Sequence, residues 1–234
     1  MFEPNHGKTL DLSVEGELWL RLPVKTRVIE PGDDLEALIE EYVAPHLEAG
    51  DLLFVSEKVV CICQRRLVPF KEIRPGRLAR LLAAQVDNRF GTPEFHGFGH
   101  GTALGMQLLI EEAGYLRTLG ATAVGAATRP LGIRGAFYYL VGKRAKSVDC
   151  PMSFSIVPYT HYAKRSPQAA DALARRLKER FGAACVIVDS NYRGAFSLGR
   201  SSKNISERFI RGLMRDNPAG QSDEMTPFII ARRA

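Results

Sequence analysis

Long apolar runs are absent from this sequence. Stretches such as residues 52–55 and 186–188 are much shorter than the roughly 18 consecutive apolar residues that a membrane-spanning helix needs. The first eight residues also lack the apolar run that a secretory signal carries. We therefore predict a cytoplasmic protein with no membrane segment and no membrane partner.

Cysteine is scarce, with four residues in 234. This number is too small for a disulfide framework. Cys61 and Cys63 lie in an apolar, strand-like run, whereas Cys150 and Cys185 stand alone. Because structural zinc uses closely spaced pairs of ligands, we predict reduced thiols in the core rather than a zinc site.

The sequence also lacks a continuous basic or acidic tract. The formal net charge is +6, but Lys and Arg are interspersed with Asp and Glu, and no familiar nucleic-acid motif is present. A positive net potential concentrates small anions near a protein surface. We expect a small acidic substrate and no specific nucleic-acid partner.

What the sequence does contain is typical of a globular protein with a substantial core, because 45% of residues are hydrophobic and 25% are charged. Apolar periodicity and turn residues predict strands over residues 24–29, 52–63, 136–141, 185–188 and 228–230. They predict helices after Asp33 and Asp34, over 77–86, 106–113 and 116–128, and from Ser166-Pro167 to Gly182. The order lacks a regular βαβ repeat, which favours an α+β fold. We expect a single unit over residues 1–234, or two intertwined subdomains.

Acidic residues at two points suggest metal chemistry. Asp189 and Ser190 follow an apolar strand, and carboxylate and hydroxyl oxygens suit Mg²⁺ or Mn²⁺. A simple turn through Asn191 explains the same residues equally well. Asp149 is a second, isolated acid that by itself reads as a loop residue.

Two polar loops suggest phosphate contacts. Residues 216–224 precede Thr226 and an apolar strand, so their backbone amides could approach phosphates, although a solvated surface loop is at least as common. The glycine-rich loop 97–101 lacks the Gly-Lys-Ser/Thr ending of a P-loop. His96 and His100 have the spacing of two metal ligands on a helix, but the intervening glycines favour a loop with unligated histidines.

Taken together, the order and spacing of several motifs resemble the coenzyme F420-0:gamma-glutamyl ligases. The N-terminal part of the resemblance consists of Glu30-Pro31-Gly32-Asp33-Asp34-Leu35 and Glu48-Ala49-Gly50-Asp51-Leu52-Leu53-Phe54-Val55. The C-terminal part consists of Ser147-Val148-Asp149, Val188-Asp189-Ser190-Asn191-Tyr192-Arg193 and residues 217–232. Residues 89–142 show little similarity to the better-known members.

The resemblance implies a ligase-like α+β fold with mixed sheets and flanking helices, a homodimer, and a GTP-dependent enzyme with Mg²⁺ or Mn²⁺. Such an enzyme adds L-glutamate through an amide bond to the deazaflavin precursor F420-0. By resemblance the metal ligands are Asp149, Asp189, Ser190 and Gln221. The residues at the nucleotide are Thr26, Arg27, Val28, Ile29, Lys58, Gly220, Gln221, Ser222, Asp223, Glu224 and Thr226.

The sequence departs from the family at three positions that should touch ligand. Ile62 stands where the family has a phosphate-facing lysine, Met152 where it has asparagine, and Gln221 where it has glutamate. Lys58 or Arg65 would have to supply the missing positive charge. Two alternatives to the ligase stay open: a protein on the same fold that binds nucleotide or deazaflavin without turnover, and a metal-dependent phosphohydrolase.

Overall fold

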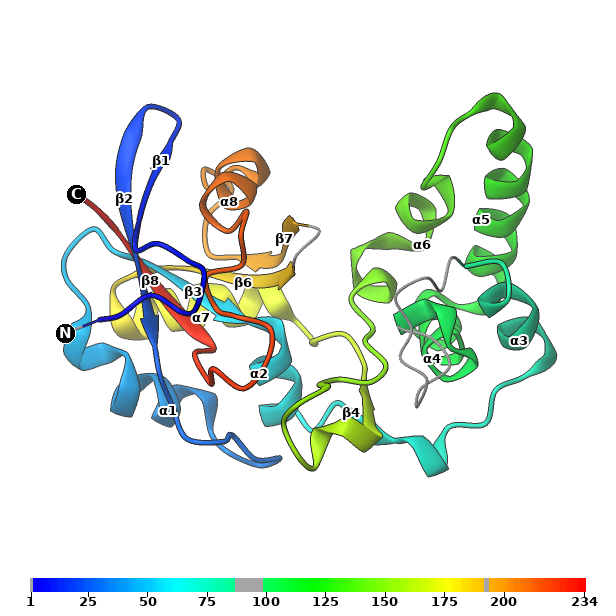
Figure 1. The fold of residues 1–234 in the computed structure, drawn as a ribbon, viewed down its shortest axis with the longest axis horizontal. Coiled ribbons are helices and arrows are strands. Elements are labelled where there is room, and N and C mark those ends of the chain that lie inside the picture. Colours follow the sequence, from blue (N-terminus) through cyan, green and yellow to red (C-terminus); the bar gives the residue numbers. More distant parts are fainter. Residues whose placement is uncertain (1, 87–98, 192–193) are drawn as a thin grey trace. The chain divides into compact units, whose positions relative to one another are not determined.

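The computed structural model describes residues 2–86, 99–191 and 194–234 (Figure 1). The chain forms two compact units. Unit 1 combines Met1–Arg65 with Pro167–Ala234, and unit 2 consists of Arg66–Ser166. Unit 2 is therefore an insertion in the sequence of unit 1.

Unit 1 is built on a mixed sheet that contains six strands in the described part of the chain. Its strands, in spatial order, are β1 (Asp11–Val14), β2 (Glu17–Val24), β8 (Phe228–Arg233), β3 (Leu52–Ser56), β6 (Ala184–Asn191) and β7 (Gly194–Arg200). β3 and β6 are parallel, and the other neighbouring pairs are antiparallel. The mixed sheet with its flanking helices confirms the α+β prediction.

Helices cover both faces of this sheet. On one face α8 (Glu207–Leu213) packs through Ile210 and Leu213 onto a core that includes Trp19 and Phe54. On the other face α7 (Ala170–Phe181) packs on β6 and β7, and α2 (Glu57–Cys63) packs on β3 and β6. Because successive side chains of a strand point to opposite faces, a strand between two helical layers is largely apolar, as in residues Leu52–Val55 of β3.

The helix predicted after Asp33-Asp34 is confirmed as α1 (Leu35–Tyr42). The Asp34 carboxylate accepts hydrogen bonds from the amides of Glu36 and Ala37, so it satisfies two donors of the first turn. Leu38 and Ile39 form the buried stripe. The short 3-10 helix η1 (Ala44–His46) follows.

Unit 2 is mainly helical. Its helices are α3 (Arg77–Ala83), α4 (Ala103–Ala113), α5 (Tyr115–Thr128) and α6 (Ala136–Lys146), with short 3-10 helices η2 (Phe70–Glu72), η3 (Gly99–Gly101), η4 (Arg129–Leu131) and η5 (Tyr159–His161). Met106, Leu109 and Ile110 of α4 lie in the core between these helices. β4 (Leu67–Pro69) and β5 (Tyr162–Lys164) form a small antiparallel ribbon. No helix in the described ranges is both long enough and apolar enough to cross a bilayer.

Two predicted strands are wrong in part or in full. Residues 52–63 divide into β3 and α2, and residues 136–141 belong to α6. Short apolar runs do not distinguish a buried strand from a buried helix by periodicity, and packing decides between them. α6 is kinked at Gly142, whose backbone angles are not helical (φ 91°, ψ 166°), and Val141 and Ala145 on either side of the kink are buried in the helical core of unit 2.

One further predicted strand and several predicted boundaries are also wrong. The strand predicted over 24–29 is absent beyond Val24, the end of β2, because Val24 is the last residue that β8 pairs with. The helix predicted to begin at Ser166-Pro167 begins at Ala170, because Ala169 has left-handed backbone angles (φ 47°, ψ 37°). Gly182 ends that helix as predicted, with φ 76°. The strand predicted over 228–230 continues to Arg233.

The four cysteines are free. Cys61 and Cys63 belong to α2 rather than to a strand. Burial raises the pKa of the Cys185 thiol to about 12 and, together with nearby Asp33 and Asp34, that of Cys63 to about 12. These thiols are therefore protonated and unreactive at neutral pH.

Replacing Gly199 with alanine is expected to lower the free energy of unfolding by about 1–3 kcal/mol. A β-carbon at this position of β7 would lie 2.2 Å from the carbonyl carbon of Ala170, so the start of α7 would have to move. Urea unfolding measures the effect. Gly120→Ala is the matched control, because nothing lies within 4 Å of the added carbon in α5. Equal stability of the two variants would contradict the prediction.

Candidate functional site

Four segments of unit 1 meet at one edge of its sheet. Val24 at the end of β2 pairs with Phe228 at the start of β8, and Phe228 also pairs with Val55 near the end of β3. Because β3 and β6 are parallel, the last residues of β6 lie at this edge too. The segments after β2 and β3, the end of β6 and the loop before β8 are thereby neighbours.

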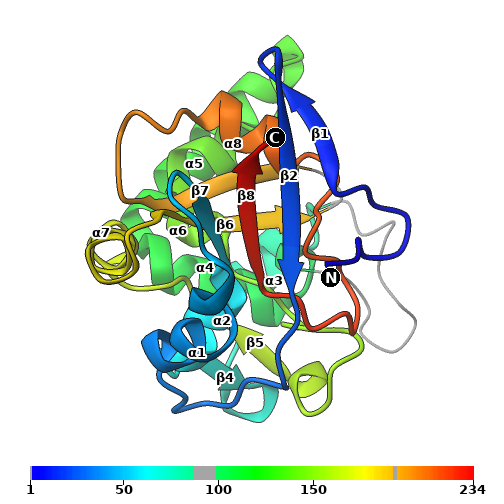
Figure 2. The same ribbon diagram turned by 90° about the vertical axis from the view of Figure 1, so that its left-hand side faces the viewer.

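Two backbone hydrogen bonds fix the loop before β8 against this edge. The amide of Thr26 donates to the carbonyl of Met225 at 2.9 Å, and the amide of Ser56 donates to the carbonyl of Pro227 at 2.9 Å. Figure 2 shows β2 beside β8 with this loop next to the end of β2. Thr26 and Thr226, both expected at the nucleotide, are therefore brought close together, and both are buried.

The loop after β2 is shaped by an ion pair. Arg27 donates from both terminal nitrogens to the Asp33 carboxylate, at 2.7 and 2.8 Å. Hydrogen bonding by Arg27, with the amide of Glu30, holds the pKa of Asp33 below its ordinary value despite partial burial. Arg27 is thus engaged within the loop, whereas Val28 is exposed and Ile29 is buried.

The loop before β8 is organised by its own side chains. Asn217 is buried with φ 52°, and its side-chain amide donates to the carbonyl of Gly220. The Glu224 carboxylate accepts from the amide of Ser222 at 2.6 Å and lies against Gly220, where a β-carbon would be 2.3 Å from it. Gln221 and Asp223 are exposed. The loop has a defined conformation with exposed polar groups.

Asp189 and Ser190 lie within β6 rather than in a turn after it. Asp189 pairs with Phe196 and Ser190 with Ala195 of β7, so the turn interpretation of these residues is wrong. The Ser190 hydroxyl donates to the carbonyl of Met214 at 3.2 Å, and the amide of Asn217 donates to the same carbonyl at 3.0 Å. The end of β6 is thereby tied to the start of the loop before β8.

The two cations proposed to replace the missing lysine lie at opposite ends of α2. Lys58 is in the first turn, at the sheet edge, and is partly buried. Arg65 follows the helix and places its guanidinium over Gly32, 3.0 Å from where a β-carbon would be. Next to Lys58, Glu57 is almost fully buried and accepts from the Cys61 thiol.

Asp149, the other predicted metal ligand, belongs to unit 2. Its backbone forms an isolated bridge with Lys164, and its carboxylate lies 3.5 Å from the Lys164 ammonium. Lys164 is completely buried and also donates to the carbonyl of Ser147. The Lys164 ammonium is therefore a counter-ion of the Asp149 carboxylate within the same unit.

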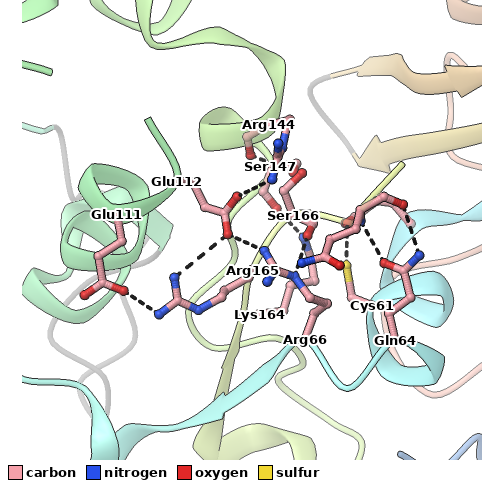
Figure 3. A network of polar contacts seen from close by, with 12 residues as sticks. Cys61, Gln64, Arg66, Glu111, Glu112, Arg144, Ser147, Lys164, Arg165 and Ser166 are labelled. Atoms are coloured by element: carbon pink, nitrogen blue, oxygen red, sulfur yellow. Dashed lines mark hydrogen bonds and ion pairs between the residues drawn. The ribbon is translucent and has the colours of Figure 1, made fainter. Parts of the chain in front are cut away.

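A second ionic group in unit 2 surrounds Glu112 (Figure 3). Its carboxylate is only 4% exposed and contacts three arginines, Arg66, Arg144 and Arg165. The neighbouring Glu111 pairs with Arg165. Because a buried carboxylate is costly without cations, these arginines offset the burial of Glu112.

The predicted loop 97–101 is described only from Gly99, where η3 begins; Gly97, Phe98 and His96 lie outside the described residues, as do Tyr192 and Arg193. Burial lowers the pKa of His100 to about 4, although Asp149 acts in the opposite direction. The His100 ring lies 5.5 Å from that of Tyr138. This imidazole is neutral at pH 7.

The residues that differ from the family motif have different surroundings. Ile62 is 4% exposed in α2 and Met152 is 4% exposed in unit 2, so both are core residues, whereas Gln221 is exposed. Within the described residues of either unit, no group of three or more His, Cys, Asp or Glu side chains could hold a metal ion.

Sequence patterns did not predict several residues that lie at the sheet edge of unit 1 or in the ionic groups of unit 2. Glu57 and Lys164 carry buried charges, and Asn5 donates to the hydroxyl of Thr226 and to the carbonyl of Pro218. Glu57 could have been found if Ser56-Glu57 had been read as a helix start. Asn5 and Lys164 have no local signal, because their partners are distant in sequence.

Comparison with known proteins adds one match. Residues 23–114 match the family model described as F420-0:Gamma-glutamyl ligase. Among curated proteins, none matches the chain. The matched segment contains the loop after β2, α1, β3 and α2 of unit 1, and continues through α3 and α4 of unit 2. Residues 23–114 are therefore similar to the F420-0:gamma-glutamyl ligases, a family of ligase-type enzymes.

Proposed function

We propose that the protein is a nucleotide- and divalent-metal-dependent ligase that adds L-glutamate through an amide bond to F420-0 or a related acidic small molecule. The observation that carries this proposal is the sheet edge of unit 1. Thr26, Lys58, Asp189 and the loop before β8 lie together at this edge. The segments that carry Thr26 and Lys58 are within residues 23–114, which match the family.

In the proposed reaction a carboxylate oxygen of the acidic substrate attacks the terminal phosphorus of GTP, and GDP leaves. The amine of glutamate then attacks the acyl carbon, losing a proton as inorganic phosphate departs. Mg²⁺ or Mn²⁺, when bound, would neutralise phosphate charge. The oxygen donors Asp189 and Ser190 fit such a hard cation, and we assign the exposed Gln221 to it as a further ligand.

The roles of the remaining groups follow from their places at the edge. Amides of residues 221–226 other than that of Ser222, together with the partly buried Lys58, would contact phosphates. Arg27 and Glu224 would act indirectly, because each is engaged in shaping its own loop. The residues assigned here as metal ligands lie outside the segment that matches the family.

The experiment is to incubate the full chain with GTP, Mn²⁺, glutamate and F420-0, and to follow GDP release and the substrate mass. We expect GDP release that depends on both acceptors, and a product heavier by one glutamate residue. Absence of both signals would contradict the stated reaction. Phosphate release without glutamate would instead indicate a phosphohydrolase.

A second candidate function is binding of nucleotide or deazaflavin without turnover. It is favoured by Ile62, which places a buried apolar side chain where the family has a lysine, and by the Lys164 ammonium beside Asp149. Calorimetric titration of GTP and of F420-0 separates the two functions. Uptake of ligand in a protein that releases no GDP would favour the binding protein.

Replacing Lys58 with methionine is expected to raise the KM for GTP about tenfold, because a charge-assisted contact with phosphate contributes about 1.5 kcal/mol or more. Arg65→Met is the matched control, and its KM should stay within about twofold because Arg65 lies beyond the far end of α2, over Gly32. Steady-state kinetics measure both. A larger increase in the KM for GTP in Arg65→Met than in Lys58→Met would assign the phosphate contact to Arg65.

A further inference from the structure

The net positive charge of the chain is located in one segment of unit 2. Residues 115–148 include no Asp or Glu but six basic residues, Arg117, Arg129, Arg134, Lys143, Arg144 and Lys146. The whole chain has 32 basic and 26 acidic residues, so the rest of the chain carries 26 of each sign and is formally neutral. This segment comprises α5, η4 and α6.

The same segment exposes most of the large apolar side chains on the surface. Of the thirteen exposed large hydrophobic residues in the described ranges, eight lie here: Tyr115, Leu116, Leu119, Val124, Leu131, Ile133, Tyr139 and Leu140. Leu116 is 87% exposed and Tyr139 is 86% exposed. Such a concentration of exposed apolar surface marks an interaction site.

The outward face of α5 is apolar rather than polar. Leu116, Leu119, Ala123 and Val124 are exposed at helical spacing, while Thr118 is buried on the opposite face. Arg117 is the one charged residue of this 14-residue helix. A surface helix of a globular protein normally turns charged residues to water. At 1.5 Å per residue the helix is about 21 Å long, shorter than the hydrocarbon core of a bilayer.

The segment that connects α5 and α6 forms the tip of a helical hairpin (Figure 1). The amide of Gly132 donates to the carbonyl of Arg129, and that of Ile133 donates to the carbonyl of Thr128, so the connection is a compact turn. Leu131 is 75% exposed and Ile133 is 54% exposed. Arg129 and Arg134 flank them and are also exposed.

We propose that the α5–α6 hairpin docks peripherally on an anionic lipid surface, with Leu131 and Ile133 inserted among the acyl chains and Arg129 and Arg134 at the headgroups. Interfacial binding combines buried apolar area with attraction of Lys and Arg to anionic lipids. The expectation of no membrane partner was based on the lack of a spanning segment, and peripheral docking requires none.

Charge and shape favour lipid over the other possible occupants. A second copy would bring a segment of the same positive charge against this one, which like-charge repulsion opposes. A nucleic acid would contact the cations, but the exposed aliphatic side chains have neither a positive charge nor a hydrogen-bond donor for its phosphates. An acidic protein is the remaining alternative, and the experiment below separates it from lipid.

The test is flotation of the full chain with vesicles of phosphatidylcholine alone or with about one-third phosphatidylserine. We expect binding to the anionic vesicles, weakened at about 0.5 M NaCl, and little binding to the neutral ones. The double variant Leu131→Ser/Ile133→Ser should lose at least about tenfold in partition coefficient. In the double variant Arg129→Gln/Arg134→Gln, the partition coefficient should fall about fivefold for each charge removed.

Two matched controls lie elsewhere on the surface. Leu81→Ser removes a 63% exposed leucine from α3, and Arg208→Gln removes an arginine whose side chain is 90% exposed in α8; both should bind vesicles like the wild type. Thermal unfolding checks that each variant is folded. Undiminished binding by the Leu131/Ile133 variant, or no binding to anionic vesicles, would overturn the proposal. Retention on polyglutamate in the absence of vesicle binding would assign the surface to an acidic protein.

Discussion

Replacing Asp189 with asparagine is expected to lower the rate of glutamate addition by at least about 100-fold, the size of effect seen when one preorganised polar group is removed from a reacting centre. Asparagine is nearly isosteric, so the pairing of Asp189 with Phe196 and the end of β6 should stay intact. The loss would come from the negative charge that we assign to metal binding.

GDP release and product mass at saturating GTP measure this effect. Asp11→Asn is the matched control, because Asp11 is an exposed residue of β1 and its substitution should leave the rate unchanged. Circular dichroism checks the fold of both variants. A rate for Asp189→Asn within about threefold of the wild type would remove Asp189 from the proposed machinery, and the family match of residues 23–114 would be unaffected.

Replacing Arg21 with methionine is expected to lower the free energy of unfolding by about 3–5 kcal/mol, the usual result of removing one partner of a buried ion pair. Arg21 is fully buried and pairs with the Asp216 carboxylate. It also donates to the carbonyls of Leu213 and Thr9, at 3.1 and 2.8 Å. The substitution would leave these two carbonyls and the Asp216 carboxylate without the hydrogen bonds that Arg21 donates.

Urea unfolding at pH 7 measures this effect, with Arg208→Met as the exposed control, expected within about 0.5 kcal/mol of the wild type. The double variant Arg21→Met/Asp216→Asn should recover part of the loss, because it leaves no unpaired carboxylate. Wild-type stability of Arg21→Met would show that the ion pair contributes nothing.

The same ion pair predicts a dependence of stability on acid pH. Burial alone would raise the pKa of Asp216, but the hydrogen bond and charge of Arg21 outweigh it, and the pKa lies below its ordinary value of 3.8. A carboxyl whose folded pKa is depressed stabilises the protein above its unfolded pKa, and this contribution disappears as the pH falls through the folded pKa. The wild type should therefore lose more stability than Arg21→Met below about pH 4.

Local signals in the sequence predicted some elements well. Asp34 begins α1 and Gly182 ends α7 as expected, because a side-chain cap and a left-handed glycine act within a few residues of chain. The helices expected over 106–113 and 116–128 are present as α4 and α5, because their apolar spacing extends over several turns.

Other elements depended on partners that are distant in sequence. The run from Leu52 to Cys63 is apolar except for residues 56–58, and the sheet register ends its strand at Ser56. Asp189-Ser190-Asn191 has the composition of a turn, yet pairing with β7 extends β6 through it. In both cases the backbone partner across the sheet overrode local preference.

The sequence by itself determined the class of fold, the start of α1, and the motifs that connect residues 23–114 with a ligase family, because these reside in short-range patterns and in the order of residues. Only the tertiary structure decided that Thr26, Lys58, Asp189 and the loop before β8 share one sheet edge, and that Asp149 is paired with a buried Lys164. The physical reason is that hydrogen bonds between strands and burial of charge depend on groups far apart in the chain, and their meeting leaves no pattern in either segment alone.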